Sequence, residues 1–591
     1  MTEQSLSFIS NLYSYNDLSR TRVQNIVDSC SDIFKNSPIN TFITGLIQRL
    51  EDFGERRENL YHFKKIQDTL FDPFKNLSTE FKRLATFERD GTYIPPETIM
   101  IGEREDYRNS EATTTLVKIP VTVEYISLKK TLKNFLELPN ILGCITEYLN
   151  SLPNESPLLQ NVVQGTLWKE KKKSFGDKFV LPLIVYYDDY ENNNPLGSHR
   201  GLAKTGAVYA SIPCLPPNLQ SKLENIFVVL LFNSLDEKDF SFGTILNPLL
   251  EELKELQTTG ITIFKDTPSQ QTIHFALLSV VGDNLAVNAI HGFICSFSGN
   301  YCCRFCLIDR SQIKDSYEVK DSLLRTQTQY DLQVKAKDFD SAGIKSRSCF
   351  NDLPGYNVID SMCVDMMHDV LEGVCQYDLG KILNVYIYKK KYFTLEVLNN
   401  RVRGFDYGPI EKRNKPPDIT QNHMKNECII ISSAEMLCLI RNIHLILGDL
   451  IPQHDEYWSL IILLKKIVDI TTAKALLKNT SLYFKELVSE YLKKLLILFP
   501  NCLKFKHHVL IHYPYLFLKF GPIGNMECSI FERLHKHGKV TSHSAICRIN
   551  VSHTIAVKNQ LRFNNLQRNS KKQIDSFTTG PFDSTSNSWE W

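Results

Sequence analysis

The sequence predicts an α/β protein: a mixed β-sheet forms its core, a helical N-terminal region precedes the core, and a large all-α insertion interrupts it. Two observations carry this prediction. Short apolar runs of strand length, separated by turns that contain Pro or Gly, are concentrated between residues 176 and 306. Segments with apolar residues at helical spacing dominate the chain before and after this part.

The strand-like runs occur in a definite order. Between residues 179 and 281, three apolar runs are followed by a segment with helical spacing and then by a fourth apolar run. Three strands, a helix and a fourth strand in this order are the arrangement of an RNase H-like core, which is therefore the predicted sheet. The predicted strands are residues 179–187, 204–213, 223–232 and 275–281, and the predicted helix is residues 246–256.

Size and composition set the broad class. A chain of 591 residues is too long for a single core, and 43% apolar with 23% charged residues is typical of globular proteins. Fifteen cysteines in a chain of this size indicate a reducing compartment with free or metal-bound thiols. The first twenty residues lack the pattern of a signal peptide, and no apolar run reaches eighteen residues, so we expect no contact with a membrane.

Acidic residues follow the first and the fourth predicted strand. Asp188 comes after residues 179–187 and Asp283 after residues 275–281, where a strand delivers a side chain to the edge of the sheet. Such carboxylates are suitable ligands for Mg²⁺ or Mn²⁺. Two structural alternatives remain open, because an Asp at position 188 also forms turns well and Asp283 could cap the next helix.

Two pairs of potential zinc ligands lie far apart in the sequence. Cys303 and Cys306 have the two-residue spacing that chelates one tetrahedral zinc ion. His508 and His512 are four residues apart, so on a helix both imidazoles lie on one face and can reach one metal. A chance cysteine pair and two histidines with structural roles are the alternatives.

Positive charge is concentrated near the C-terminus although the net charge is only +2. Residues 501–575 contain twelve Lys or Arg and three acidic residues. A solvated surface explains such a run by default, and a polyanionic partner requires further support. Glu532 lies in this part on an amphipathic helical pattern, where pairing with Lys536 at i+4 is the alternative to a catalytic role.

Four motifs in this order resemble CACTA-type (En/Spm-like) DNA transposases and their uncharacterised animal relatives, and more distantly the catalytic subunit of the V(D)J recombinase. The resemblance covers roughly residues 175 to 545. That family has an RNase H-like fold, a triad of acidic residues, a helical insertion before the third acid, and a zinc site of two Cys and two His. The motifs are YYDDYENNNPLGS (186–198), GDNLAVNAIHGF with CCRFC (282–306), DMMHDVLEGV (365–374), and HHVLIHY with GPIGNMECSIFERLHK (507–536).

The resemblance implies roles for individual residues. The catalytic acids, which would hold Mg²⁺ or Mn²⁺, are Asp188, Asp283 and Glu532. The ligands of a structural Zn²⁺ are Cys303, Cys306, His508 and His512. Asp189 could replace Asp188, and His507 could replace His508. Glu372 is the second choice for the third acid, although His368 and Glu372 are more simply explained by a structural or supporting role.

The function implied by the resemblance is cleavage of DNA by a two-metal mechanism, followed by strand transfer with the liberated 3′-hydroxyl. The expected partners are transposon ends and target DNA, the expected location is the nucleus, and the expected assembly is a homodimer. The alternative is a transposon-derived, catalytically inactive DNA-binding or scaffold protein. The basic residues expected to meet phosphates are Lys536, Lys539, Arg548, Lys558 and Arg562.

These patterns divide the chain into five expected parts. A run of lysines at residues 169–173 is expected to be a linker, and the C-terminal end is Ser/Thr-rich, as in disordered segments. The parts are a helical N-terminal region (1–175), the first part of the core (176–306), an all-helical insertion (307–500), a segment with the zinc-ligand helix and the final catalytic helix (501–560), and a disordered tail (561–591).

Overall fold

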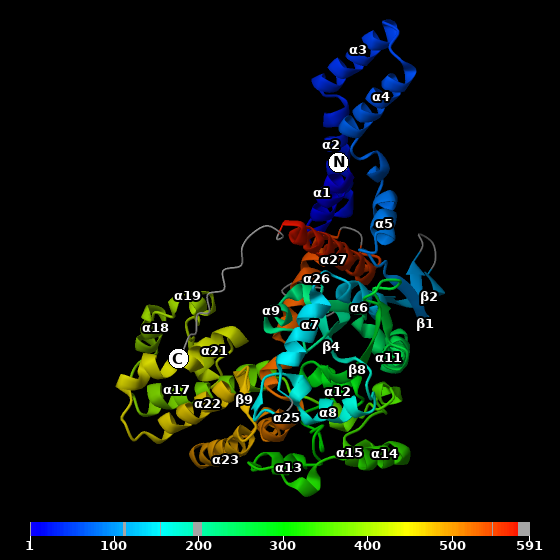
Figure 1. Ribbon diagram of the computed structural model, residues 1–591. Coiled ribbons are helices and arrows are strands. Elements are labelled where there is room, and N and C mark those ends of the chain that lie inside the picture. The colour runs from blue at the N-terminus through cyan, green and yellow to red at the C-terminus, as the bar shows by residue number, and fades with distance from the viewer. Residues whose placement is uncertain are drawn as a thin grey trace.

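A seven-stranded mixed sheet forms the centre of the protein, with helices on both sides of it (Figure 1). The computed structural model describes residues 2–109, 114–153, 155–192, 204–337, 339–545 and 548–576. The strands are β1 (Glu97–Asn109), β2 (Thr114–Tyr125), β4 (Val180–Glu191), β5 (Lys204–Ser211), β6 (Ile226–Asn233), β7 (Ile261–Ile263) and β8 (Gln271–Val281).

The strand order in the sheet is β1-β2-β6-β5-β4-β8-β7. Strands β4 and β8 are parallel, and the other neighbouring pairs are antiparallel. The parallel strands are buried almost along their whole length, as their unbroken apolar runs predict. The four predicted strands are β4, β5, β6 and β8, and the predicted helix is α11 (Asn247–Thr258).

The expectation of a wholly helical N-terminal region is wrong for residues 97–125. This segment forms the β1–β2 hairpin, and β2 joins the main sheet where Glu124 and Tyr125 pair with β6. Its alternation of Thr, Val and Ile is a strand pattern, but the interspersed charges conceal it. Pro120 is tolerated because β2 pairs with β6 only at its last two residues.

The first four helices of the N-terminal region form two groups. Helices α1 and α2 pack with the C-terminal helix α27 around a small core that contains Leu6, Ile9 and Leu561. Helices α3 and α4 form a hairpin that projects from the body (Figure 1). The helices of this region are α1 (Thr2–Ser14), α2 (Arg20–Lys35), α3 (Pro38–Asp52), α4 (Arg57–Phe71), α5 (Glu80–Arg89), α6 (Leu128–Leu136), α7 (Ile141–Ser151) and α8 (Thr166–Lys173).

Two further expectations need correction. The lysines of residues 169–173 belong to helix α8 rather than to a linker. The expected disordered tail, residues 561–591, begins as helix, because α27 (Val551–Ser576) continues to Ser576 and packs on α1. The rest of that tail, residues 577–591, lies outside the described residues.

Between residues 307 and 500 the described chain is mostly helical: α17, α18, α19, α21 and α22 form a lobe beside the sheet, whereas α13, α14 and α15 lie beneath the sheet region (Figure 1). One exception is β9 (Leu476–Leu477), which pairs with β3 (Leu158–Leu159) and joins this lobe to the segment before β4. The helices here are α13 (Arg310–Ile313), α14 (Gln327–Ala336), α15 (Phe339–Ala342), α16 (Val358–Ser361), α17 (Cys375–Asn384), α18 (Leu395–Gly404), α19 (Gly408–Glu411), α20 (Gln421–Lys425), α21 (Ser433–Leu447), α22 (Glu456–Thr472) and α23 (Thr480–Leu498).

The chain then returns to the sheet. Helix α26 lies against β4, on the sheet that the chain left about 250 residues earlier, and it carries Glu532. Among the described residues, no helix combines the length and apolar character needed to cross a membrane. The other helices are α9 (Pro217–Gln220), α10 (Phe242–Ile245), α12 (Asn284–Ile290), α24 (Phe505–Leu510), α25 (Tyr513–Phe520) and α26 (Ser529–Ser544).

Candidate metal centre and acidic cluster

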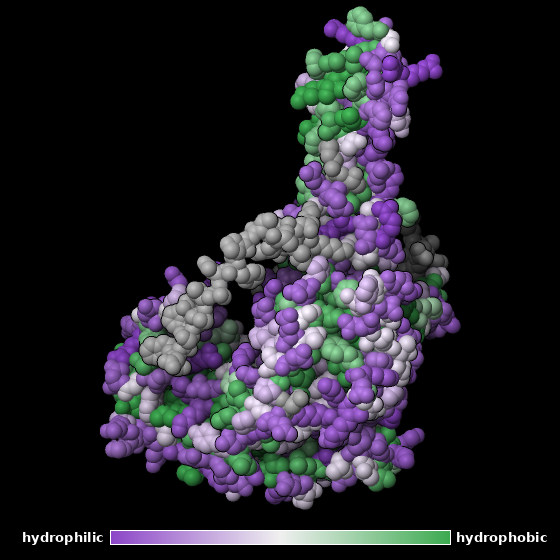
Figure 2. Space-filling model, in the orientation of Figure 1, coloured by the Kyte–Doolittle hydropathy of each residue, from purple (hydrophilic) through white to green (hydrophobic). Residues whose placement is uncertain are grey.

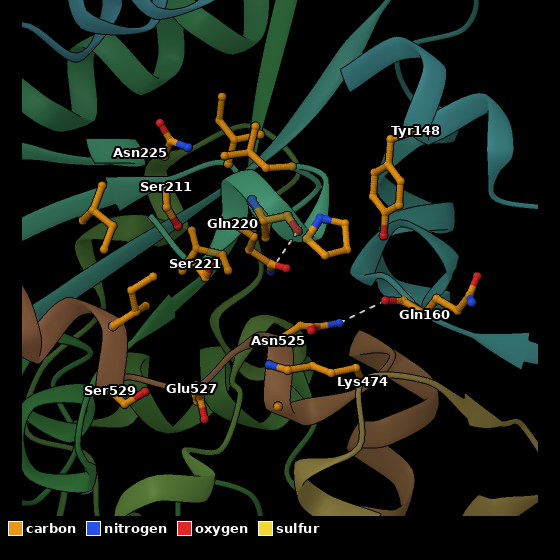
Figure 3. Close-up of a pocket in the computed structure, with 18 of the residues that line it drawn as sticks. Tyr148, Gln160, Ser211, Gln220, Ser221, Asn225, Lys474, Asn525, Glu527 and Ser529 are labelled. Atoms are coloured by element: carbon orange, nitrogen blue, oxygen red, sulfur yellow. Dashed lines mark hydrogen bonds between the residues drawn. The ribbon is translucent and has the colours of Figure 1, made fainter. Parts of the chain in front are cut away.

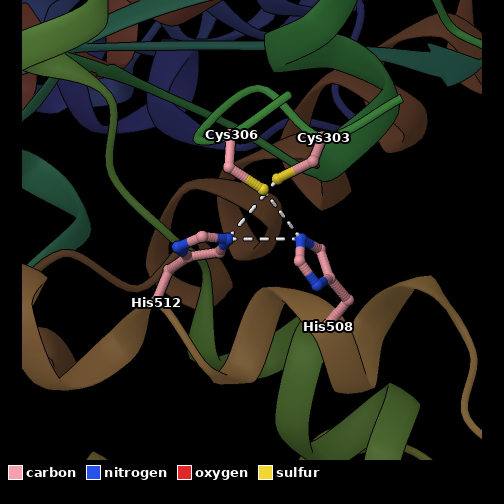
Figure 4. Close-up of side chains that lie close together, drawn as sticks. All are labelled: Cys303, Cys306, His508 and His512. Atoms are coloured by element: carbon pink, nitrogen blue, oxygen red, sulfur yellow. Dashed lines mark hydrogen bonds between the residues drawn. The ribbon is translucent and has the colours of Figure 1, made fainter. Parts of the chain in front are cut away.

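The two cysteines and two histidines predicted as zinc ligands meet in one buried group (Figure 4). Cys303 and Cys306 lie in the loop after α12, His508 lies in α24, and His512 precedes the first turn of α25. The Nε2 atoms of the two imidazoles are 3.3 Å apart. The distance from Cys306 Sγ to His508 Nε2 is 3.2 Å, and that from Cys303 Sγ to His512 Nε2 is 3.6 Å.

These distances fit a tetrahedral zinc site. Bonds of about 2.0–2.3 Å to nitrogen and sulfur imply ligand atoms roughly 3.3–3.8 Å apart at the corners of a tetrahedron. The four donor atoms all lie within 4.8 Å of one another, and they form the one group of three or more possible metal ligands found among the described residues. This buried Cys₂His₂ group could therefore bind a metal such as zinc.

Burial and charge favour the same conclusion. The four side chains are at most 3% exposed, and two thiolates would neutralise a divalent cation in this apolar environment. Burial raises the pKa of the Cys303 thiol, but the Cys306 thiol and both imidazoles outweigh this effect and lower it well below its usual value. Within the described chain, the Nδ1 atoms of His508 and His512 have no hydrogen-bond partner.

His507, the alternative ligand, points away from this group. Its Nε2 lies 3.0 Å from Asp378 Oδ2, and its Nδ1 accepts a hydrogen bond from the backbone N–H of Lys504. Both His507 and Asp378 are fully buried. His507 therefore anchors α24 to α17, whereas His508 completes the Cys/His group.

The pairing of β4 with β8 brings the first two predicted acids together. Tyr186 on β4 is the partner of Val281 on β8, and Asp188 and Asp283 each come two residues later. Since side chains two residues apart on a strand point to the same face, both carboxylates reach the same edge of the sheet. Gly282 permits this approach, because a Cβ at this position would lie 2.5 Å from the carbonyl oxygen of Tyr187.

The structure also bears on the alternatives for these two acids. Asp189, next to Asp188, points to the other face and pairs with Lys204, with 3.0 Å between Lys204 Nζ and Asp189 Oδ1. Asp188 lies within β4, which continues to Glu191, and does not end the strand. Asp283 caps α12, since its Oδ1 accepts a hydrogen bond of 2.6 Å from Ala286 N. Asp283 therefore does cap α12, and it does so through its Oδ1 atom.

Helix α26 brings Glu532 to the same region from the far end of the chain. Phe531 stacks on Tyr186 with ring centroids 4.7 Å apart, and His535 packs against Tyr190 at 4.6 Å. These contacts hold α26 against the face of β4 that carries Asp188. The Oε1 atom of Glu532 is buried without a hydrogen-bond partner within the described residues, as expected for a group that awaits a ligand.

Asp365 and His368 complete the cluster, and sequence reasoning gave Asp365 no role. His368 Nδ1 donates to Asp365 Oδ2 at 2.5 Å, and His368 Nε2 lies 3.2 Å from Glu532 Oε1, a charge contact without hydrogen-bond geometry. Asp365 also accepts a hydrogen bond of 3.0 Å from Cys528 N, just before α26. A π-helical turn at Met367–Val374 presents these groups, and such turns are frequent at functional sites.

The carboxylates influence one another's protonation. Burial raises the pKa of Asp188, and the negative charge of Asp283 raises it further, to about 6. Burial also raises the pKa of Glu532, which His368 lowers and Asp188 raises, with a net value of about 7. Burial lowers the pKa of His368, but Asp365 and Glu532 outweigh this effect and raise it to about 10. The cluster thus gathers negative charge around one imidazolium.

The chain matches no protein-family model and no curated protein.

Glu372, the alternative third acid, lies at the edge of the cluster. Its Oε1 accepts a hydrogen bond of 3.1 Å from Ser433 N at the start of α21, and its carbonyl accepts one from Lys506 Nζ. Its backbone departs from helical geometry at the end of the π-helical turn. A structural role at the junction of this turn with α21 therefore accounts for Glu372.

A buried hydrogen-bond network joins the Cys/His group to the acidic cluster. Arg304 donates to Asn284 at 2.5 Å, Asn284 donates to Asp369 at 2.5 Å, and Tyr513 donates to Asp369 at 3.0 Å. These side chains are at most 7% exposed. Each of them adjoins a site residue in the sequence: Cys303, Asp283, His368 and His512 respectively.

A cavity of about 330 Å³ opens beside the acidic cluster. Asp283 and His368 line one part of it, and Lys504 and Lys506 line another. Aromatic rings complete the wall, with Phe297 and Phe505 stacked at 4.3 Å and Lys504 Nζ 3.7 Å above the Tyr377 ring.

A larger cavity of about 560 Å³ lies beside Ser529, Phe531 and Arg533 of α26 (Figure 3). None of the seven predicted site residues lines it. One of its polar side chains bonds to the backbone, since Asn525 Nδ2 donates to the backbone carbonyl of Gln160 at 3.1 Å. This cavity is therefore separate from both groups described above.

Two of the basic residues expected to contact DNA phosphates, Lys558 and Arg562, are not exposed to solvent as that role requires. Lys558 is only 4% exposed, and its Nζ donates to the carbonyls of Tyr15 and Leu18 at 3.0 and 2.5 Å. Arg562 is half-buried against His537. Both residues fasten α27 to the rest of the protein. Lys536, Lys539 and Arg548 are exposed.

Proposed function

We propose that the protein is a transposase-like enzyme that cleaves DNA strands with Mg²⁺ or Mn²⁺ and joins them through a liberated 3′-hydroxyl. The observation that carries this proposal is that Asp188, Asp283 and Glu532 come to one region from β4, the end of β8 and α26, where the charge of Asp283 acts on Asp188 and that of Asp188 acts on Glu532. Among the described residues these carboxylates do not form a group with all ligand atoms within 4.8 Å of one another, so a bound cation would have to draw them closer. Three carboxylates placed together are costly without a cation, so a site for divalent metal explains their position best.

The sheet supports the proposal. The order β6-β5-β4-β8, in which β4 pairs antiparallel with β5 and parallel with β8, is the order expected of an RNase H-like core. The long helical segment between β8 and α26 corresponds to the insertion that the resemblance to CACTA-type transposases implies.

The protein's own groups have separate tasks in this mechanism. Asp188 and Asp283 would hold cations from the sheet edge, and Glu532, whose Oε1 has a charge contact with His368 but no hydrogen bond among the described residues, would hold them from α26. When bound, these cations would activate the attacking oxygen and stabilise the leaving oxygen. His368, fixed by Asp365, orients Glu532 and limits the repulsion among the acids. Lys504 and Lys506, in the adjoining cavity, would attract the DNA backbone.

Zinc in the Cys₂His₂ group would have a structural task, since four protein ligands leave no open position. The group joins residues 202 positions apart, Cys306 and His508. It thereby holds the segment that leads to Glu532 close to the segment that follows Asp283.

The decisive experiment is metal-dependent nicking of supercoiled plasmid DNA by the purified protein. Asp283→Asn should abolish nicking in Mg²⁺ and Mn²⁺, because it removes a carboxylate ligand while an Asn can still cap α12. Asp189→Asn is the matched control, since Asp189 points away to Lys204, and it should retain nicking. Retention of full nicking by Asp283→Asn would refute the proposed chemistry.

A second candidate is a transposon-derived protein that binds DNA or scaffolds other proteins without catalysis. Two observations favour it: His368 occupies the space beside Glu532, and Asp283 is engaged as a helix cap. This candidate predicts DNA binding that is unchanged by Asp283→Asn and no nicking in either metal.

Action on DNA also implies a nuclear location, which a fluorescent fusion of the full chain would test.

A further inference from the structure

The projecting hairpin of α3 and α4 has an exposed apolar face (Figures 1 and 2). Residues at positions i, i+3 and i+7 form a stripe along each helix. Their exposed fractions range from 42% to 67%, far above those of core residues. The stripes consist of Ile39, Phe42 and Leu46 on α3 and of Phe63, Ile66 and Leu70 on α4.

The seam between the two helices combines polar pairs with two buried apolar residues, Ile47 and Leu60, which are 6% and 7% exposed. Gln67 Nε2 donates to Asn40 Oδ1 at 2.8 Å and to Thr44 Oγ1 at 2.6 Å. Lys64 pairs with Glu51 at 3.2 Å. A hairpin that needed only its own stability would turn its larger apolar side chains into this seam, so the outward stripes indicate a partner.

Both stripes belong to the same face of the hairpin. At 100° per residue, each stripe is rotated in the same sense from the seam of its helix, by roughly 140° on α3 and roughly 100° on α4. In an antiparallel pair, rotation in the same sense by less than 180° leads to the same side. Figure 2 shows this side as a continuous apolar strip, with hydrophilic residues opposite it.

We propose that this face binds the same face of a second copy of the chain, so that two hairpins form a four-helix bundle. The exposed area supports a second copy. The six stripe residues together with Phe53, which follows α3 and is 88% exposed, present roughly 750 Å². Stable interfaces bury about 800 Å² on each partner, so two such faces suffice for a dimer.

The charge of the hairpin also favours a second copy over DNA. Acidic and basic residues are equal in number on α3 and α4, and none of them interrupts the two stripes. A face without net charge does not repel its own copy, and it does not attract phosphates. The charged residues are Arg49, Glu51, Asp52, Arg57, Glu58, Lys64, Lys65 and Asp68.

The position of the hairpin permits this contact. Each helix has 15 residues and is therefore about 22 Å long, so the apolar face stands clear of the sheet and of the helical lobe (Figure 1). Two chains can therefore join through their hairpins without covering the sheet or the helical lobe (Figure 1).

The test is the mass of the full chain in solution, measured by light scattering during gel filtration. The wild-type protein should have twice the chain mass of 68.0 kDa. The double variant Phe42→Glu/Ile66→Glu should have the mass of one chain, because it places four acidic groups in the interface. Ile410→Glu, at an apolar residue on α19 that is 87% exposed, is the matched control and should remain dimeric.

Charge complementation tests direct contact between the faces. A mixture of Phe42→Glu/Ile66→Glu with Phe42→Lys/Ile66→Lys should regain the dimer mass, whereas each variant alone should be monomeric. A monomeric wild-type chain at micromolar concentration would overturn the proposal, and so would a dimer that survives the Glu variant. Both outcomes are independent of nicking, so the proposed catalytic function stands or falls separately.

Discussion

Replacement of Cys306 by Ser removes one thiol from the Cys/His group without changing the size of the side chain. Cys306 and His508 are 202 residues apart, and a cross-link across a loop of that length restricts the unfolded chain by about 5 kcal/mol at 25 °C. If zinc provides this cross-link, Cys306→Ser should lower the free energy of unfolding by up to about 5 kcal/mol. Part of that value is lost if the three remaining ligands still hold the ion weakly.

Zinc content and stability should be measured on the same samples. Elemental analysis after dialysis should give about one zinc per wild-type chain and far less for Cys306→Ser. Urea unfolding followed by tryptophan fluorescence should show a lower midpoint for the variant. A strong chelator should lower the wild-type midpoint towards that of the variant and leave the variant unchanged.

Cys302→Ser provides the matched control. Cys302 is 1% exposed and precedes Cys303, but it does not belong to the group of four ligands. The cost of a buried hydroxyl is therefore similar in both variants, and only Cys306→Ser should lose zinc. Equal zinc content and equal midpoints in the two variants would refute the assignment of the metal centre.

Three further predictions concern the same region. His508→Gln should lose zinc, whereas His507→Gln should keep zinc but lose about 1–3 kcal/mol of stability, because buried Asp378 would keep only Tyr491 as a partner; metal analysis and urea unfolding distinguish the two. The raised pKa values of Asp188 and Glu532, about 6 and about 7, mean that the folded metal-free protein holds protons that the unfolded chain releases between about pH 4 and 7. The contribution of these two carboxylates to stability should therefore fall as the pH rises through this window, by no more than about 3 kcal/mol for each, whereas burial lowers the pKa values of His291, His535 and His537 to about 3, 3 and 4 and acts in the opposite sense. The carboxylate contribution is measured as the stability of the wild type minus that of Asp188→Asn/Glu532→Gln at each pH; this difference should fall from about pH 4 to 7, and a difference that rises would contradict this account. Mn²⁺ should raise the stability of the wild type above about pH 7. Asn284→Ala should keep zinc yet cost about 2–4 kcal/mol in urea unfolding, because Arg304 and Asp369 would lose a shared buried partner, and a loss below about 0.5 kcal/mol would contradict the network.

Local patterns were sufficient to predict several elements. The apolar runs at β4, β5, β6 and β8 and the helical spacing of α11 are visible in the sequence because burial imposes them on consecutive residues. The same holds for Cys303 and Cys306, whose two-residue spacing is itself the geometry of chelation. These features depend on neighbours in the sequence, so a single chain reveals them.

Features that depend on distant partners could not be predicted. Asp365 belongs to the acidic cluster because it contacts Cys528, which is 163 residues away, and the local sequence around it indicates only a helix. The sequence predicts that Lys558 is a solvent-exposed basic residue. In the structure, three carbonyl oxygens from residues more than 500 positions earlier in the chain surround its Nζ. The helix at residues 561–576 was concealed for the same reason, since α1 at the opposite end of the chain supplies its apolar contacts.

The network between the two groups explains why neither can be considered alone. Tyr513 and Arg304 adjoin a histidine and a cysteine of the metal centre, and they converge on Asp369, either directly or through Asn284. Asp369 in turn adjoins His368, which contacts Glu532. The links from the Cys/His group to His368 are buried hydrogen bonds and connections between neighbouring residues of the chain, and the last link, from His368 to Glu532, is a charge contact of 3.2 Å, so a displacement of the Cys/His group is expected to disturb His368. The ligands of the metal centre and the carboxylates therefore share one connected frame, although more than 200 residues separate their members in the chain.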